Sequence, residues 1–269
     1  MNILINYLYE HYPFTTASYF EMAAKEYPEV CIFRSDNYDP KKIDLVLNVE
    51  PVGEIIKIPG VPSVYYEIDN HIIAGHDRHF YDQVDMVLLA QEVNREFYSE
   101  YNTEILPLGC WPKLHKRYPD EKEKYDIGFI GNDTYPRRRK LLEVLDKNFK
   151  LLRATSKPGE EYSRLLNQCK LTFNCSMQQD VNMRFFEAVA SGRMLITDFM
   201  EEQLIFGNPK VHYDVYNNDA QLVDKVRYYL DHEKEREKIA SAGINHFHFN
   251  NSYSNRLKQL LCLTKNLVS

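Results

Sequence analysis

The sequence has few cysteines and no long apolar run. Its 269 residues include five cysteines, an odd number, and no two of them form a C-x-x-C pair. A disulfide framework is therefore not expected, and reduced thiols fit a cytoplasmic protein. No stretch approaches the roughly 20 apolar residues of a membrane-spanning helix. The start, M-N-I-L-I-N, has the pattern of a strand without a preceding basic region, which does not indicate a signal peptide.

The glycine motifs of two large nucleotide-binding classes are also missing. After the first apolar run the turn reads Y-E-H-Y-P-F-T-T, with no G-x-G-x-x-G, so an NAD or FAD site is not expected there. An oxidoreductase is therefore the least favoured function. The sequence contains no Walker A motif, which disfavours a P-loop kinase.

Acidic residues concentrate in the first part of the chain. Residues 1–117 contain 10 Lys+Arg and 18 Asp+Glu, a net charge of −8, and the remainder carries +2. An anionic substrate should therefore bind more readily to the second part. DNA lying across the first part would meet a repulsive field, which disfavours nucleic acid as a partner.

Apolar runs typical of buried strands alternate with helical patterns along the first part. Strands are expected at residues 3–9, 30–34, 45–49, 63–68, 86–90 and 104–108. Helices are expected at residues 16–26 and 91–101. Residues 113–124 are rich in proline and charge, which is typical of a linker.

The same alternation restarts after this linker. Strands are expected at residues 127–130, 150–153, 171–174, 194–197 and 211–213, and helices at 136–147, 160–168, 183–190 and 220–243. Near-continuous apolar strands between helices are typical of parallel sheets covered on both faces. The pattern therefore predicts an α/β protein with two Rossmann-like domains, residues 1–117 and 118–251, whose parallel sheets face a cleft.

The most informative segment is residues 180–198, D-V-N-M-R-F-F-E-A-V-A-S-G-R-M-L-I-T-D. A polar loop leads into a short helix at 183–190, which Ser191 and Gly192 end before a buried strand. The helix carries Glu187 among its apolar, core-facing residues. A carboxylate is rarely placed there without a partner. At the edge of a parallel sheet, the expected partners are the hydroxyl groups of a bound ligand.

Together with four further blocks, this segment resembles the family 4-like GT-B glycosyltransferases, including the spore-maturation CgeB-type proteins. The resemblance covers residues 124–262. The further blocks are Y-D-I-G-F-I-G (125–131), P-R-R-R-K (136–140), Y-Y-L-D-H-E-K-E-R-E-K-I-A-S-A-G (228–243) and Y-S-N-R-L-K-Q-L-L (253–261).

The resemblance implies transfer of a sugar from a nucleotide-diphosphate sugar, with retention and without a metal or other cofactor. It implies that Glu187 contacts the donor ribose. Many relatives have another Glu where this chain has Gln179. The last helix, residues 252–269, is expected to return to the first domain. The acceptor stays open among a glycan, a protein, a small molecule and, less favoured, DNA.

Further donor-binding residues are expected around two helix starts. Gly131 ends a strand and lets a ligand approach the backbone, while four cations follow at 137–140. Because cations in a first helical turn oppose the helix dipole, a bound pyrophosphate would compensate them. Arg138 matches an arginine that recurs in the CgeB-like group. The alternative is a solvated basic helix face.

Three residues near Glu187 are the next candidates for donor binding. Arg184 shares a helix flank with Glu187, three positions away, and is expected to orient it or to reach a phosphate. Asp180 and Asn182 are expected to face the donor. Their alternative role is ordinary helix capping.

In the first part, Y-Y-E-I-D-N-H follows a strand end, where α/β sites collect. Glu67, Asp69 and His71 are candidates for a group near the transferred sugar, and the resemblance favours Asp69. Their alternative is a polar loop. Glu10 and His11 are candidates on the acceptor side, since acceptors bind after the first strand in GT-B enzymes.

Histidines offer weaker signals. His71, His76 and His79 have no clear metal-ligand geometry in their spacing, so a metal is not expected. His115 is expected in the hinge between the domains, within reach of a ligand. Two other functions stay open: a non-catalytic GT-B module that binds a nucleotide, a glycan or a partner, and a sugar transferase acting on DNA bases.

Overall fold

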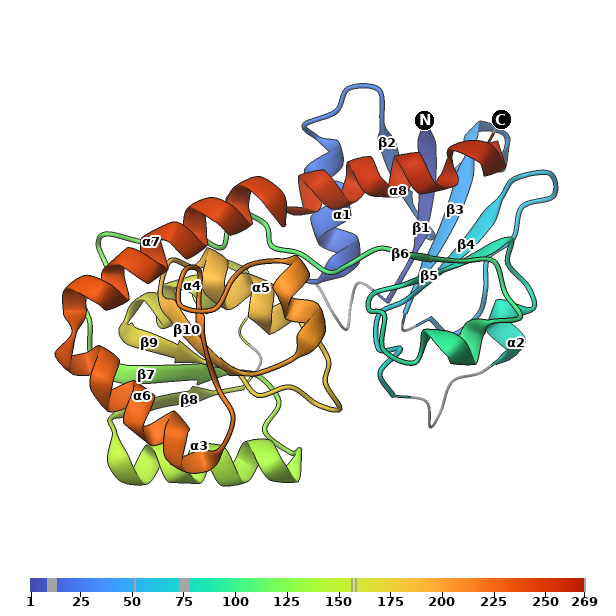
Figure 1. The fold of residues 1–269 in the computed structure, drawn as a ribbon. Helices are drawn as coiled ribbons and strands as arrows, with labels where there is room; N and C mark the ends of the chain where they lie inside the picture. Colours follow the sequence, from blue (N-terminus) through green and yellow to red (C-terminus); the bar gives the residue numbers. More distant parts are fainter. Residues whose placement is uncertain (9–13, 51, 73–77, 156, 158, 269) are drawn as a thin grey trace. The chain divides into compact units, whose positions relative to one another are not determined.

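The computed structural model describes residues 1–8, 14–50, 52–72, 78–155, 157 and 159–268. The chain divides into two compact units (Figure 1). The first unit contains Met1–Leu108 and Tyr253–Ser269, and the second contains Gly109–Ser252. Each unit is built on one sheet, and all the strand pairs described in both sheets are parallel. The predicted α/β class with two Rossmann-like domains is confirmed.

The first unit has a six-stranded sheet in the order β2-β1-β3-β4-β5-β6. Its strands are β1 (Asn2–Asn6), β2 (Cys31–Arg34), β3 (Leu45–Val49), β4 (Ser63–Glu67), β5 (Met86–Leu89) and β6 (Thr103–Ile105). The central strands β3, β4 and β5 are buried along their whole length. This burial explains why their sequences are apolar runs and not alternating patterns.

Helices and aromatic side chains cover the two faces of this sheet. Helices α1 (Thr16–Ala24) and α8 (Tyr253–Val268) pack together on one face, where the Tyr253 ring lies 5.2 Å from that of Phe20. On the other face, Tyr65 packs with Tyr81 and Tyr98. These two tyrosines come from the short helix α2 (Arg78–Tyr81) and the 3₁₀ turn η2 (Arg95–Tyr98).

The second unit has a five-stranded sheet in the order β11-β10-β9-β7-β8. Its strands are β7 (Tyr125–Ile130), β8 (Leu151–Ala154), β9 (Cys169–Phe173), β10 (Met194–Asp198) and β11 (Asp214–Tyr216). Its helices are α3 (Pro136–Asn148), α4 (Gly159–Asn167), α5 (Met183–Ala190), α6 (Asp219–Asp231) and α7 (Glu233–Asn250). Short 3₁₀ turns, η1 (Pro40–Lys42) and η3 (Glu201–Ile205), complete the described elements of the two units.

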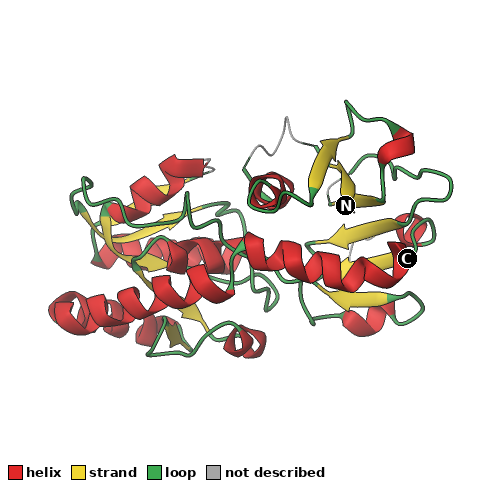
Figure 2. Ribbon diagram, turned by 90° about the horizontal axis from the view of Figure 1, so that it is seen from above, coloured by secondary structure: helices red, strands yellow, loops and turns green. Residues whose placement is uncertain are grey.

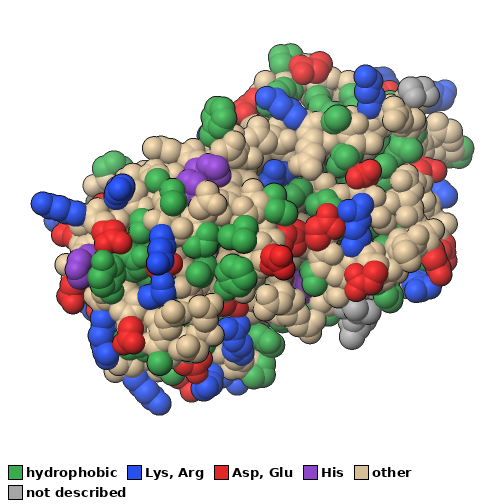
Figure 3. Space-filling model, viewed as in Figure 1, with side chains coloured by type: hydrophobic (Ala, Val, Ile, Leu, Met, Phe, Trp, Pro, Cys, Tyr) green, Lys and Arg blue, Asp and Glu red, His purple; other side chains and the backbone are tan. Residues whose placement is uncertain are grey.

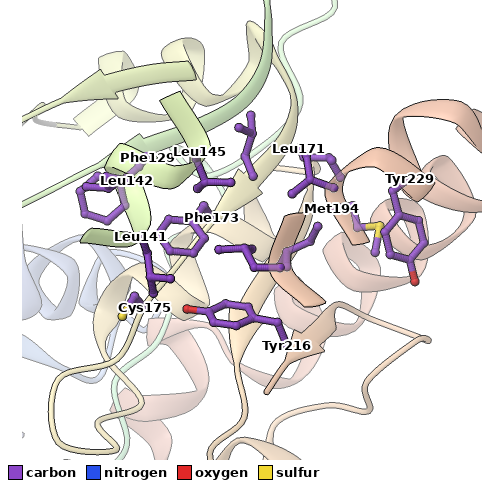
Figure 4. Packing of buried hydrophobic residues seen from close by; sticks show 14 of the residues in the cluster. Phe129, Leu141, Leu142, Leu145, Leu171, Phe173, Cys175, Met194, Tyr216 and Tyr229 are labelled. Atoms are coloured by element: carbon purple, nitrogen blue, oxygen red, sulfur yellow. The ribbon is translucent and has the colours of Figure 1, made fainter. Parts of the chain in front are cut away.

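Helices cover both faces of the second sheet (Figures 1 and 2). Helices α3 and α6 lie on one face, and α4, α5 and α7 lie on the other. Under α3 and α6, Phe129, Leu141, Phe173 and Tyr216 belong to one buried cluster (Figure 4). The Phe173 and Tyr216 rings stack with their centroids 6.0 Å apart.

Numbered within each unit, both sheets contain the strand order 2-1-3-4-5, and the first sheet adds a sixth strand, β6. After its second strand, the chain crosses to the other side of the first strand and adds the later strands there. The direction of winding reverses between β1 and β3 in the first unit and between β7 and β9 in the second. In open parallel sheets, ligands bind outside the carboxyl ends of the strands at this point. The order therefore directs attention to the residues after β7 and β9.

The strands expected at 3–9 and 104–108 are the shorter β1 and β6, and three other expected elements differ more from the structure. The expected helix at 91–101 is only η2, because Asn94 adopts a left-handed conformation (φ 61°). The strand expected at 211–213 is β11, a few residues later. Tyr213, the residue before β11, is buried, and its hydroxyl donates to the carbonyls of Gln203 and Gly207. The helix expected at 220–243 is two helices that meet at His232, and Arg236 donates to the Tyr229 carbonyl at the end of α6.

Candidate active site of the second unit

Helix α5 presents two charged residues beside the ends of β7 and β9. Its start is capped by Asn182, whose side chain accepts a hydrogen bond from the Phe185 amide at 3.2 Å. Phe185 and Phe186 are buried, and both rings pack near Phe247 of α7. Because these aromatic rings fix the apolar face, Arg184 and Glu187 take the flank of the helix that faces the strand ends.

Glu187 lies against a buried histidine. Nε2 of His115 is 3.4 Å from Oε1 of Glu187, and the Glu187 side chain is 13% exposed. Burial lowers the pKa of His115 to about 3, and His248 contributes in the same direction. The ring is therefore neutral near pH 7. Arg193, which follows α5, donates instead to Glu123 and to the Asn167 carbonyl.

Arg184 is held by the backbone at the end of β7 and by Asn174, the residue that follows β9. Its Nε donates to the Ile130 carbonyl at 2.8 Å, and NH1 donates to Oδ1 of Asn174 at 3.1 Å. Its guanidinium lies over the Phe129 ring, 4.7 Å from the centroid. Burial, and then the nearby charge of Arg138, lower the pKa of Arg184. Arg184 therefore supplies a partly buried positive charge at the switch point between β7 and β9.

Gly131 makes room for this arginine. Its φ of +149° is a conformation that other residues rarely adopt, and a Cβ there would overlap the Arg184 guanidinium. The Gly131 amide donates to the Ala154 carbonyl at 2.9 Å, which continues the contact between β7 and β8. The sequence predicts that a ligand approaches the backbone at Gly131. In the structure, the Arg184 guanidinium occupies the space beside this glycine.

Arg138 connects the loops that follow β7 and β9. It is buried, and Nε and NH2 donate to the Cys175 carbonyl at 3.1 and 2.8 Å. NH1 donates to the Asn132 carbonyl at 2.7 Å. Three of its five N–H groups thus hold backbone in place. Its charge lies near that of Arg184.

The other cations of the basic helix start have protein partners. Arg137 pairs with Asp198 at 2.7 Å, and Lys140 pairs with Asp219 at 2.7 Å. The argument that these cations need a bound anion is therefore wrong for Arg137 and Lys140, because carboxylates compensate them. Figure 3 shows the same mixture more widely: on the face drawn, cationic side chains lie beside anionic ones.

The start of α3 has no side-chain cap. Tyr135 occupies the N-cap position, so neither Asp133 nor Thr134 caps the helix. Asn132 accepts bonds from the amide and hydroxyl of Thr134, and Asp133 pairs with Arg153 at 2.6 Å. Both potential caps are thus engaged elsewhere. Within the described part of the chain, no side chain accepts a hydrogen bond from the first-turn amides of α3, which suits an anionic ligand.

Asp180 and Asn182 shape the loop before α5. Asp180 is buried, accepts a hydrogen bond from the Met177 amide, and has a pKa raised by burial. Gln178 and Gln179, between Met177 and Asp180, are exposed and adopt left-handed conformations (φ 55° and 69°). Asn182 therefore caps helix α5, which is the alternative role given above. Asp180 closes the preceding loop through its hydrogen bond with the Met177 amide.

His115 lies in a different place from the one expected. It belongs to the second unit, where it is 1% exposed, and the division of the chain falls after Leu108. The expected hinge position at residues 113–124 is therefore wrong for His115. The contact between His115 and Glu187 could not be predicted from the sequence, because the two residues are far apart in the chain and the fold brings them together.

In the first unit, the candidates after β4 are held by Glu50, which sequence reasoning missed. Glu50 Oε2 accepts the amides of Ile68 and Asp69, both at 2.9 Å. Glu67 is buried, and the Tyr81 hydroxyl donates to it at 2.6 Å. Burial, and then a hydrogen bond with Glu50, raise the pKa of Glu67 far above its usual range, so it is protonated at neutral pH.

Asp69 and His71 differ in exposure. Asp69 is exposed, whereas His71 is buried with Nδ1 3.5 Å from Nε2 of Gln91. Of the three candidates, Asp69 is the one that solvent reaches most readily. Glu10 and His11 lie outside the described residues.

Two searches of the described residues give negative results. Within these ranges, no three His, Cys, Asp or Glu side chains come together in a way that could bind a metal ion. None of the helices in the described part of the chain has the length and apolar character needed to span a bilayer.

A family model described as glycosyl transferase-like matches residues 113–262. The chain belongs to this family. The match covers the whole arrangement around Arg184 and Glu187. The expected membership in a glycosyltransferase family is confirmed, and the closer likeness to CgeB-type proteins stays a prediction. No curated protein matches the sequence.

Solved structures of glycosyltransferase-like proteins share the fold. Anabaena HepE, in complex with UDP and glucose, has a TM-score of 0.68 at 11% identity, covering 99% of this chain and 100% of that one. T4 phage β-glucosyltransferase, in complex with UDP-glucose, has a TM-score of 0.68 at 13% identity, covering 98% and 99%. These likenesses confirm the GT-B fold.

The chain is shorter than another similar structure. S. aureus TarM has a TM-score of 0.59 at 12% identity, and the match covers 81% of this chain but 54% of TarM. The present chain therefore spans about half the length of TarM.

Proposed function

We propose that the protein transfers a sugar from a nucleotide-diphosphate sugar, and that the second unit binds the donor. The observation that carries this proposal is the arrangement at the ends of β7 and β9. There, Glu187 lies against His115, the partly buried Arg184 lies against Gly131, and the start of α3 has no side-chain cap among the described residues. A carboxylate suits ribose hydroxyls, and cations with free amides suit a pyrophosphate.

Each part of the donor has a proposed partner. Glu187 accepts hydrogen bonds from the ribose hydroxyls. The amides at the start of α3, together with Arg138 and Arg184, neutralise the pyrophosphate. Asp180 and Asn182 hold the loop before α5 in the shape that brings Arg184 to the strand ends. Because this arrangement supplies positive charge from the protein, we propose that transfer needs no metal.

The reaction breaks the bond between the anomeric carbon and the diphosphate oxygen, and both electrons leave with the diphosphate. The acceptor hydroxyl oxygen bonds to the same carbon, and its proton passes to the departing diphosphate. Cations and amides directed at the leaving group stabilise the transition state more than the ground state, because the diphosphate gains charge. Following the family 4-like resemblance, we propose retention of the anomeric configuration.

We propose that the first unit supplies the groups near the transferred sugar and the acceptor. Asp69, on a turn held by Glu50, is the best placed of its candidates because it is exposed. His71 and the protonated Glu67 support this turn from the buried side. The reduced cysteines fit a cytoplasmic location, which we also propose.

Uridine nucleotides are the first donors to test. The similar structures of HepE and T4 phage β-glucosyltransferase were solved with UDP or UDP-glucose. A thermal-shift panel of UDP, GDP, ADP, CDP and dTDP, each also as available sugar conjugates, tests the site. Ligand at about 100 times its dissociation constant stabilises a protein by about 2.7 kcal/mol, which is readily measured.

The panel is repeated on Glu187→Ala and on a control, Glu143→Ala, whose exposed side chain lies on α3. We expect one nucleotide to shift the wild type and the control alike. Loss of charge-assisted hydrogen bonds should weaken its binding to Glu187→Ala by roughly 1.5–3 kcal/mol. No shift with any nucleotide would contradict the proposal.

A non-catalytic GT-B module is the second candidate function. It is favoured by Gln179, which stands where many family 4-like relatives have a Glu near the sugar. Such a module would bind the nucleotide but would not release it from a sugar conjugate. Transfer to DNA is less favoured, because residues 1–117 carry a net charge of −8. Binding to duplex DNA that falls steeply with salt would revive it.

A further inference from the structure

We propose that His115 is a positioning residue for Glu187, holding one carboxylate oxygen so that the carboxylate is oriented to accept the ribose hydroxyls. The inference rests on the proposed function, because it takes the ribose as the ligand of Glu187. His115 itself need not touch the donor.

The hydrogen bonds around His115 determine which of its nitrogens carries the proton. The Trp111 amide donates to Nδ1 at 2.9 Å, so Nδ1 is an acceptor. In a neutral imidazole the other nitrogen then carries the hydrogen. This nitrogen, Nε2, is the one that lies 3.4 Å from Oε1 of Glu187. The contact therefore places the protonated nitrogen of a neutral ring beside a carboxylate oxygen.

The turn that carries His115 is held on several sides. The amides of Leu114 and His115 both donate to the Trp111 carbonyl, at 3.0 and 2.8 Å. Nε2 of His248, on α7, lies 2.7 Å from the His115 carbonyl and 3.0 Å from the Ala190 carbonyl. One histidine of α7 thus ties the turn to the end of α5, the helix that carries Glu187.

A neutral donor suits this position better than a cation. It fixes one oxygen of Glu187 while leaving the full negative charge to strengthen hydrogen bonds to the ribose. An arginine there would form a neutral ion pair and compete with the hydroxyls. The low pKa of the buried His115, about 3, keeps the ring neutral across the physiological range.

The test compares UDP with its 2′-deoxy and 3′-deoxy analogues by calorimetry on the full chain. The variants are His115→Phe, which fills the ring space without a donor, and His115→Gln, which restores an N–H group. Glu187→Ala is the reference. We expect wild type to prefer UDP over at least one deoxy analogue by about 10-fold or more. Glu187→Ala and His115→Phe should both lose most of this preference, and His115→Gln should regain part of it.

The outcomes separate the inference from the proposed function. If wild type binds no UDP, or if Glu187→Ala keeps the preference, the proposed ribose contact is wrong. If Glu187→Ala loses the preference and His115→Phe keeps it, Glu187 binds the ribose but His115 does not position it. A general loss of stability in His115→Phe would weaken UDP and the deoxy analogues equally and leave their ratio unchanged.

A measurement on wild type does not depend on any variant folding. Long-range ¹H–¹⁵N spectra distinguish the two neutral tautomers of a histidine ring, and the His115 signals are identified by their absence in His115→Gln. We expect a proton on Nε2 and a change in its shift when UDP is added. A proton on Nδ1 would overturn the inference.

Discussion

Gly131 and Arg184 form the most demanding pair of residues in the candidate site. Gly131 has a positive φ, and the Arg184 guanidinium occupies the space where a Cβ would lie. The arginine is held by the carbonyl of Ile130, one residue earlier. Any side chain at position 131 must therefore strain the backbone and displace the partly buried guanidinium of Arg184.

We predict that Gly131→Ala lowers the free energy of unfolding by about 1–3 kcal/mol and weakens UDP binding, because Arg184 must move. Urea denaturation and calorimetry measure the two effects. Gly53→Ala is the matched control, since a Cβ at Gly53 meets nothing within 4 Å. A Gly131→Ala variant as stable and as tight-binding as this control would contradict the placement of Arg184.

The protonated Glu67 gives the first unit a measurable pH dependence. Because its pKa in the fold lies above the unfolded value, the folded state binds the extra proton between the two. Its contribution to stability is present below the unfolded pKa and is lost as pH rises. One proton changes the free energy of unfolding by about 1.4 kcal/mol per pH unit.

We predict that Glu67→Gln, which stays neutral, flattens the fall in stability between pH 5 and pH 9. Denaturation followed by circular dichroism at several pH values gives this slope. Glu104→Gln, at an exposed position of β6, should leave the slope as in wild type. Equal slopes for wild type and Glu67→Gln would show that Glu67 is ionised in the fold.

At the scale of single elements, helix α5 was predicted with its observed bounds, Met183–Ala190. Its signals are local: an Asn cap, an apolar stripe, and Ser191-Gly192 at its end, with Gly192 at φ +79°. Elements whose limits depend on tertiary contacts were predicted less well. At the break between α6 and α7, Arg236 donates to the Tyr229 carbonyl, and η2 begins directly after a left-handed Asn94.

The cap of α5 should matter for binding as well as for stability. We predict that Asn182→Ala lowers the free energy of unfolding by about 1 kcal/mol and weakens UDP binding, because the start of α5 positions Arg184. Asn218→Ala is the matched control, since Asn218 caps α6 in the same way, accepting the Gln221 amide at 2.9 Å. It should lose similar stability and bind UDP normally. If Asn182→Ala and Asn218→Ala bind UDP equally well, the Asn182 cap does not contribute to donor binding.

At the scale of the whole molecule, apolar strands alternating with helices predicted both Rossmann-like units. The grouping of Arg184 with Glu187 also followed from sequence, because residues three apart share a helix flank. The buried contacts of Arg138 with backbone carbonyls, and the contact of His115 with Glu187, did not follow. Such contacts join distant segments, and residue type alone does not specify their partners.

The central claim is that this chain activates a nucleotide-diphosphate sugar. The most direct measurement is the release of UDP from a panel of UDP-sugars, by wild type and by Glu187→Ala. We predict slow release by wild type even without an acceptor, because water can accept the sugar, and at least about 10-fold slower release by Glu187→Ala. Nucleotide binding without release from any conjugate would contradict the claim and leave a binding module.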